Sequence, residues 1–193
     1  LESIELLDPP DFATMKKHGL HCAMVSFPTI ETGDGVKLGG IPKAFNRLEH
    51  HDLLLQAYEP LLKASADAGF KQVICFSGNR DGMDDEQGLD NCAIGLKKLL
   101  PQAEKLGITL CMELLNSKVN HKDYMCDHSA WGVELCKRIG SEHFKLLYDI
   151  YHMQIVKAIQ ATGYTGYLGQ EFIPARKDPL ASLKQAVGIC DVG

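Results

Sequence analysis

The sequence predicts an α/β fold in which helices alternate with the strands of a parallel sheet. Glycines recur where amphipathic, helix-like segments end and short apolar segments begin, and glycine suits the left-handed position after a helix. The two kinds of segment also alternate strictly along the 193 residues, which is typical of crossovers between parallel strands. The glycines at these joints are Gly19, Gly69, Gly107, Gly140 and Gly163.

Six apolar segments are predicted as strands, and their number bears on the architecture. A barrel of eight strand–helix units takes about 250 residues, so 193 residues correspond to about six units. The pattern therefore leaves open a doubly wound sheet or an eight-unit barrel with two units absent. The predicted strands cover residues 3–7, 20–27, 71–77, 108–114, 144–150 and 166–172.

Capping residues mark two of the helices between these strands. Asp11 is expected to cap a helix over 12–18. Asp127 or Ser129 is expected to cap a helix over 131–139.

Proline and glycine mark the remaining elements. A long helical segment over 44–68 should be kinked or split at Pro60, and the next one should be kinked or split at Pro101. The pair Asp178–Pro179 is expected to start a last helix. Residues 28–41, which contain four glycines, should form a long loop.

Composition excludes several classes of protein. The chain has 45% hydrophobic and 23% charged residues, which is ordinary for a globular protein. Its formal charge of −5 provides no basic surface for nucleic acid, so no nucleic-acid partner is expected. No apolar run approaches the length of a membrane span, and the first residues do not resemble a signal peptide, so no membrane partner is expected.

The seven cysteines are widely spaced and form no C-x-x-C pair. Cys22, Cys75 and Cys111 lie inside apolar, strand-like segments. They are expected to be buried thiols in a reducing compartment, so the chain is predicted to be cytoplasmic. The pairs His50–His51 and His121/His128 are expected to be solvated.

Carboxylates stand at the ends of three predicted strands. Glu113, Asp149 and Glu171 each follow an apolar run, and in parallel α/β folds the carboxyl ends of the strands carry the active site. Three converging carboxylates repel each other unless a cation lies among them. Oxygen ligands suit Mg²⁺ or Mn²⁺, with Zn²⁺ as an alternative, so one divalent metal ion is predicted. The alternative is that each acid pairs with its own Arg or Lys.

Three segments together resemble a known family. The segments Cys111–Asn116, Leu147–Gln154 and Gly166–Pro174 are similar to the strand-end Glu, Asp-x-x-His and Glu-Phe-x-Pro motifs of xylose isomerase-like TIM barrels, and most of all to the hydroxypyruvate isomerase type. The resemblance implies a single (β/α)8 TIM-barrel domain over residues 1–193, of which about six units are present.

The resemblance also implies roles for individual residues. Glu113, Asp149 and Glu171 would bind the metal, and Glu113 and Glu171 would act as the catalytic acid/base pair. The substrate would be a small hydroxy-carbonyl compound, hydroxypyruvate by resemblance, converted to tartronate semialdehyde through an enediolate. Candidate substrate contacts are His152, Arg176, Asn79 and Arg80, with surface ion pairing as the alternative for the arginines.

Two departures from the family pattern matter. Related ketose 3-epimerases have Glu-x-x-Asn-Arg-x-Glu, whereas here Glu113 and Asn116 are followed by Ser-Lys-Val, without the second Glu. The interval from 144 to 166 can hold one crossover but not two. The first strand and the seventh-strand region, near residues 156/157, are therefore expected to be missing, together with a fourth metal ligand.

Other functions remain open at this stage. A sugar or inositol epimerase or dehydratase would use the same scaffold, and a barrel that binds a metabolite without turnover is a further alternative. An abasic-site endonuclease would need more metal ligands and a basic face, so it is disfavoured. A homo-oligomer is compatible with the sequence.

Overall fold

The computed structural model describes residues 2–149 together with residues 178 and 181. The chain divides into two compact units, residues 1–147 and residues 148–193. All of the strands and helices whose bounds are given below belong to the first unit.

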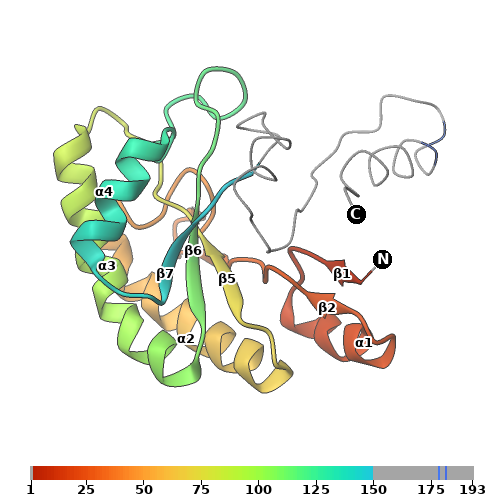
Figure 1. The fold of residues 1–193 in the computed structure, drawn as a ribbon. Coiled ribbons are helices and arrows are strands. Elements are labelled where there is room, and N and C mark those ends of the chain that lie inside the picture. Colours follow the sequence, from red (N-terminus) through yellow and green to blue (C-terminus); the bar gives the residue numbers. More distant parts are fainter. Residues whose placement is uncertain (1, 150–177, 179–180, 182–193) are drawn as a thin grey trace. The chain divides into compact units, whose positions relative to one another are not determined.

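Three parallel strands form the main sheet. Strands β5 (Gln72–Cys75), β6 (Thr109–Glu113) and β7 (Phe144–Leu147) pair in that order (Figure 1). In β6, Leu110 pairs with Val73 of β5 on one side and with Phe144 of β7 on the other. All three side chains are buried, as expected for apolar segments at the centre of a covered parallel sheet.

The first two strands extend this sheet in chain order. Strand β1 (Ser3–Ile4) pairs in parallel with β2 (His21–Cys22). Beyond β2, Val25 forms parallel bridges to Leu7 on one side and to Val73 of β5 on the other. Among the described residues the order of parallel strands, joined through the bridges of Val25, is β1–β2–β5–β6–β7 and has no reversal, whereas a doubly wound sheet has one. This arrangement is that of a barrel wall. Of the two architectures that the sequence left open, it therefore favours the barrel over the doubly wound sheet.

Four α-helices and two short 3-10 helices connect the strands. Helices α2, α3 and α4 lie along the same side of the sheet, with α3 packed against both of the others (Figure 1). The left-handed backbone of Gly69, Gly107 and Gly140 ends these three helices, as predicted. The bounds are η1 Pro9–Asp11, α1 Phe12–Lys17, η2 Leu48–His50, α2 His51–Ala68, α3 Asp85–Leu106 and α4 Ser129–Ile139.

Of the two effects predicted for the prolines, kinking or splitting of the helix, splitting does not occur. Pro60 lies inside α2 and Pro101 lies inside α3, and each helix continues through its proline. Both prolines are exposed, while the helices bury Leu54 and Leu62 around Pro60 and Leu100 and Ala103 around Pro101. Packing of the apolar face therefore outweighs the hydrogen bond lost at each proline.

The starts of α2 and α4 differ from the predictions, whereas α1 starts at Phe12 as predicted but without the predicted cap. Helix α2 begins at His51 rather than at residue 44, because the amides of Phe45 and Asn46 bond the carbonyls of residues 76 and 77 instead. The N-cap of α4 is His128, whose Nδ1 accepts a hydrogen bond from the Trp131 amide (3.2 Å), and not Asp127 or Ser129. Asp11 precedes α1 without a side-chain capping bond.

The segment over residues 28–41 contains structure that the loop prediction missed. Strands β3 (Ile30–Glu31) and β4 (Lys37–Leu38) form a short antiparallel hairpin. The Thr32 amide donates to the carbonyl of Val36 (2.8 Å), which closes the turn between them.

Predictions for the end of the chain fall largely outside the described residues. These are the strand at 166–172 and the junction at 156/157. One local feature can be compared: Asp178 Oδ1 accepts a hydrogen bond from the Ala181 amide (3.3 Å), which is the capping interaction predicted for Asp178.

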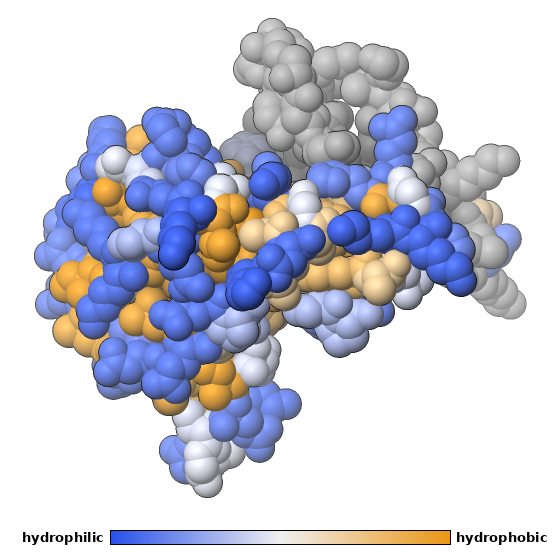
Figure 2. Space-filling view, turned by 90° about the horizontal axis from the view of Figure 1, so that it is seen from below, coloured by the Kyte–Doolittle hydropathy of each residue, from blue (hydrophilic) through white to orange (hydrophobic). Residues whose placement is uncertain are grey.

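The thiols of the core are buried, as predicted. All six cysteines in the described part of the chain are free, and Cys22, Cys75 and Cys111 are buried. Burial raises the pKa of the Cys111 thiol to about 12, so it stays protonated. The surface view in Figure 2 shows hydrophilic residues interspersed with smaller hydrophobic patches. No helix in the described part of the chain is long and apolar enough to cross a membrane.

One histidine was predicted to be solvated and is not. His51 is only 1% exposed, and its Nε2 lies 2.9 Å from the carbonyl oxygen of Phe45. A methyl group added at Gly95 of α3 would lie 2.7 Å from the same nitrogen, so the glycine allows the imidazole to fit. His50 and His121 are half-buried, and His128 is exposed.

Candidate active site at the carboxyl edge of the sheet

Polar segments follow the carboxyl ends of β5, β6 and β7. Glu113 is the last residue of β6 and pairs in register with Leu147, the last residue of β7. Asp149 follows Leu147 by two residues along the chain. Glu113 thus stands at the carboxyl end of a strand of the main sheet.

Glu113 is fixed by its neighbours in β6. Met112 and Leu114 are fully buried on either side of it, whereas Glu113 itself is half-buried. Its carbonyl oxygen accepts a hydrogen bond from the Tyr124 hydroxyl (3.0 Å). The next amide, that of Leu114, donates to the carbonyl of Leu147 (3.2 Å). The backbone that carries the carboxylate is therefore held from both sides.

The other predicted site residues cannot be placed beside Glu113. Asp149 is half-buried and belongs to the second compact unit. Glu171, His152 and Arg176 lie outside the described residues. Within residues 2–149, 178 and 181, no three His, Cys, Asp or Glu side chains gather as metal ligands. Metal binding by the three carboxylates stays a prediction.

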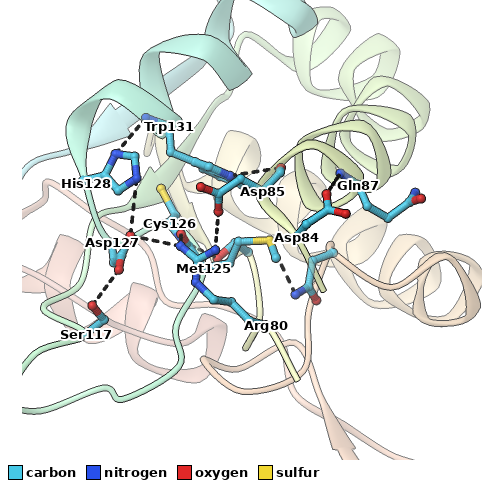
Figure 3. Close-up of polar contacts among 12 residues, drawn as sticks. Arg80, Asp84, Asp85, Gln87, Ser117, Met125, Cys126, Asp127, His128 and Trp131 are labelled. Atoms are coloured by element: carbon cyan, nitrogen blue, oxygen red, sulfur yellow. Dashed lines mark hydrogen bonds and ion pairs between the residues drawn. The ribbon is translucent and has the colours of Figure 1, made fainter. Parts of the chain in front are cut away.

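Arg80 lies in the segment after β5 and contacts two carboxylates and a carbonyl (Figure 3). Its guanidinium donates to Asp85, to Asp127 (3.3 Å) and to the carbonyl of Met125 (3.2 Å). Burial acts to lower the pKa of Arg80, but Asp85 and Asp127 outweigh it and raise that pKa above its ordinary value. Arg80 thus joins the segment after β5 to the segment after β6. Its role as a substrate contact stays a prediction.

Asn79 is held mainly through its backbone. Its amide donates to the carbonyl of Pro42 (2.9 Å), and its carbonyl accepts from Asn46 Nδ2 (2.5 Å). The side chain of Asn46 is completely buried and lies against Gly78, where an added Cβ would be 2.2 Å from Asn46 Oδ1. Gly78 also has a φ of +106°, so only glycine fits this close approach.

Two aspartates of the edge adopt left-handed backbone conformations. Asp81 has φ 44° and Asp123 has φ 75°. The Asp81 amide donates to Asp123 Oδ2 (2.8 Å), and the Arg80 amide donates to the Asp123 carbonyl (2.7 Å). Side-chain and backbone bonds to Asp123 therefore offset the cost of these conformations, and strained residues of this kind cluster at functional sites.

Sequence reasoning missed Asp123, Tyr124 and Asp127. Asp127 was considered only as a helix cap, but its carboxylate accepts from Ser117 Oγ (2.6 Å) and from Arg80 (Figure 3). No periodic pattern marks these residues, because their side chains bond partners more than 40 positions earlier in the chain, in addition to the nearer Ser117 and Glu113.

Parallel strands paired in chain order, helices along one side and acidic residues after the strand ends define the protein as an α/β barrel. The profile described as "Xylose isomerase-like TIM barrel" matches residues 13–179. The chain belongs to this family, as the motif resemblance predicted.

Two of the similar proteins are epimerases. The chain is 36% identical over 61 residues to D-psicose 3-epimerase of Agrobacterium fabrum; that segment is 32% of this chain and 20% of the relative's length. The crystal structure of 3-keto-D-glucoside 4-epimerase from E. coli has a TM-score of 0.70 and 17% identity, covering 96% of this chain and 86% of that one.

A second similar structure is that of an endonuclease. The AP endonuclease, family 2, from Brucella melitensis has a TM-score of 0.69 and 15% identity, covering 99% of this chain and 79% of that one. At such identities the two structural likenesses establish the fold.

Proposed function

We propose that the protein is a divalent-metal-dependent isomerase that moves a proton between adjacent carbons of a small hydroxy-carbonyl compound, hydroxypyruvate being the substrate that we favour. The observation that carries this proposal is the position of Glu113. It is a half-buried carboxylate at the carboxyl end of β6, in register with Leu147 at the end of β7. Active sites of barrel folds lie at this end of the strands.

The donor set fits a hard divalent cation. Glu113, Asp149 and Glu171 would hold it, because carboxylate oxygens are the ligands that Mg²⁺ and Mn²⁺ prefer. Bound there, the metal would polarise the substrate carbonyl and acidify the neighbouring C–H bond.

Glu113 would transfer the proton, with Glu171 as its partner. A carboxylate at this place can remove the proton from the acidified carbon, and the second carboxyl group can return a proton at the adjacent carbon, exchanging ketone for aldehyde.

Epimerisation of a ketose is the second candidate, and the 36% identity to D-psicose 3-epimerase over 61 residues favours it. It would use the same proton removal and return the proton to the opposite face of the same carbon. Against it stands the Ser-Lys-Val that follows Asn116, which lacks the second Glu of the epimerase motif.

Exchange of substrate C–H in deuterated water tests both candidates. We expect exchange into hydroxypyruvate that depends on added Mg²⁺ or Mn²⁺. Glu113→Gln should reduce the exchange rate by about 10²-fold or more, because it removes a general base. Glu171→Gln should have a similar effect.

A matched control separates the loss of the Glu113 carboxylate from a general change in the net charge of the protein. Glu59 is exposed on α2, so Glu59→Gln changes the net charge equally and should leave exchange unchanged. A panel with D-fructose and D-psicose distinguishes the two candidates. Exchange that persists in both Glu113→Gln and Glu171→Gln contradicts the proposal, and so does the absence of exchange with every substrate and metal in the wild type.

A further inference from the structure

Tyr124 places a hydroxyl group between the ends of β5 and β6. The residue is completely buried and belongs to the segment that follows β6. Its hydroxyl oxygen accepts a hydrogen bond from the Ser77 amide (3.1 Å), and the hydroxyl donates to the carbonyl of Glu113 (3.0 Å). The Sδ of Met112, at 3.8 Å, is the weaker acceptor. The tyrosine thus connects the backbones of two strands.

The two groups that Tyr124 bridges, the Ser77 amide and the Glu113 carbonyl, would bond each other directly if the ladder between β5 and β6 continued. In the register of β5 and β6, Gln72 pairs with Thr109, and the Thr109 amide donates to the carbonyl of Lys71 (2.8 Å). Bonds in a parallel ladder recur at every second residue. Continuing this pattern, the Ser77 amide would donate directly to the carbonyl of Glu113. The Tyr124 hydroxyl occupies that position in the ladder.

The insertion changes how the end of β6 is supported. Two hydrogen bonds through an oxygen span a wider gap than one direct bond, so β6 separates from β5 at Glu113. On its other side β6 remains paired with β7, through the Leu114 amide and the Leu147 carbonyl (3.2 Å). Tyr124 therefore sets the distance between the two strand ends at the residue that carries the carboxylate.

The tyrosine is itself firmly held. Its ring packs edge-on against Phe76, with centroids 6.4 Å apart. Residue 124 forms an antiparallel bridge with Asn79, and the next amide, that of Met125, donates to the carbonyl of Gly78 (3.0 Å). Burial raises the pKa of the Tyr124 phenol well above its usual value, so the hydroxyl remains a donor across the working pH range.

We propose that Tyr124 is a positioning residue, whose hydroxyl spaces the ends of β5 and β6 and thereby orients the Glu113 carboxylate for proton transfer. The second part rests on the proposed function of Glu113. In this role Tyr124 need not contact substrate. The value of kcat, rather than substrate affinity, then depends on one buried hydroxyl.

Tyr58 provides a matched control. It is also completely buried, and its hydroxyl donates to the carbonyl of Ile74 in β5 (3.1 Å). Tyr58→Phe and Tyr124→Phe each remove one buried hydroxyl that bonds the backbone of β5 or of the segment directly after it. Only Tyr124→Phe removes the connection to Glu113.

The experiment measures exchange kinetics and backbone protection in the whole protein. For Tyr124→Phe we expect kcat for substrate C–H exchange to fall by about 10- to 100-fold, since small misplacements of a catalytic group have effects of this size. KM should stay within about twofold, because the lost interaction acts on the chemical step. Tyr58→Phe should keep the wild-type kcat. Hydrogen exchange of the Ser77 amide, followed by NMR, should accelerate in Tyr124→Phe and not in Tyr58→Phe.

The outcomes separate this proposal from the proposed function. If the wild type exchanges no substrate proton, the proposed function fails, and Ser77 amide protection still tests the bridge. Unchanged protection in Tyr124→Phe would overturn the spacing role. Wild-type kcat in Tyr124→Phe, or an equal loss of kcat in both variants, would overturn the positioning of Glu113.

Discussion

The helix layer and the carboxyl edge of the same sheet are held together by different interactions. Leu54 and Leu62 of α2 and Leu96 of α3 are fully buried apolar side chains of the helix layer. At the edge, ion pairs of Arg80 and hydrogen bonds of Asp123 join the segments that follow β5 and β6, next to the buried side chain of Tyr124. The contrast teaches that apolar burial stabilises the frame, while polar partners place the segments around Glu113.

The largest effect on stability is expected in the helix layer. Leu62→Ala should reduce the free energy of unfolding by about 2–5 kcal/mol, because it leaves a cavity in a closely packed core. The rate at which the folded variant catalyses exchange of substrate C–H should stay near that of the wild type. Urea unfolding and the exchange assay, run well below the melting temperature, measure the two quantities. A loss of exchange as large as that of Tyr124→Phe would break the comparison.

An intermediate effect on stability is expected at the edge. Arg80→Ala should reduce the free energy of unfolding by about 1–3 kcal/mol, because the Met125 carbonyl and two carboxylates lose their donor. Trypsin should then cleave faster after Lys118 and Lys122, in the segment that Arg80 holds. The rate of substrate C–H exchange should fall more in Arg80→Ala than in Leu62→Ala.

Arg138 is the control for this prediction. It bonds three carboxylates, Glu86, Asp90 and Glu134, on the outer surface of α3 and α4. Surface ion pairs contribute little, so Arg138→Ala should leave cleavage after Lys118 and the exchange rate unchanged. Equal effects of the two substitutions would show that Arg80 does not hold the edge.

The smallest effect concerns the buried histidine of the helix layer. Burial lowers the pKa of His51, with Lys98 and His50 acting in the same direction and the Phe45 carbonyl and Asp52 opposing them. Below the unfolded pKa of about 6.5, the unfolded chain binds a proton that the folded one resists, so stability falls as pH falls. One such proton changes the free energy of unfolding by at most about 1.4 kcal/mol per pH unit.

His51→Gln sharpens this point. The variant should lose part of the decrease in stability between pH 7.5 and 5.5, measured by urea unfolding at each pH. Above pH 7.5 the folded and unfolded imidazoles are both neutral, and the slopes of wild type and variant should agree. A variant with the full wild-type decrease would show that His51 titrates alike in both states.

The sequence predicted the frame better than the edge, for a physical reason. The strand at 71–77 and its neighbours bury apolar side chains in a local periodic pattern, and the glycine after each helix has a local conformational role. The network of Arg80 and Asp127 joins residues 47 positions apart, so no window of the sequence reveals it. The sequence left open whether Pro60 and Pro101 kink or split their helices, because the packing that keeps both helices continuous is not a local property.

Each strand of the parallel wall after β1 pairs with one that precedes it in the chain, which bears on how the chain folds during synthesis. A strand that docks on one already formed needs no segment still to be translated, so β1, β2 and β5 can assemble while later residues are still in the ribosome. The parallel wall can thus form during translation, as each new strand pairs with one that has already left the ribosome.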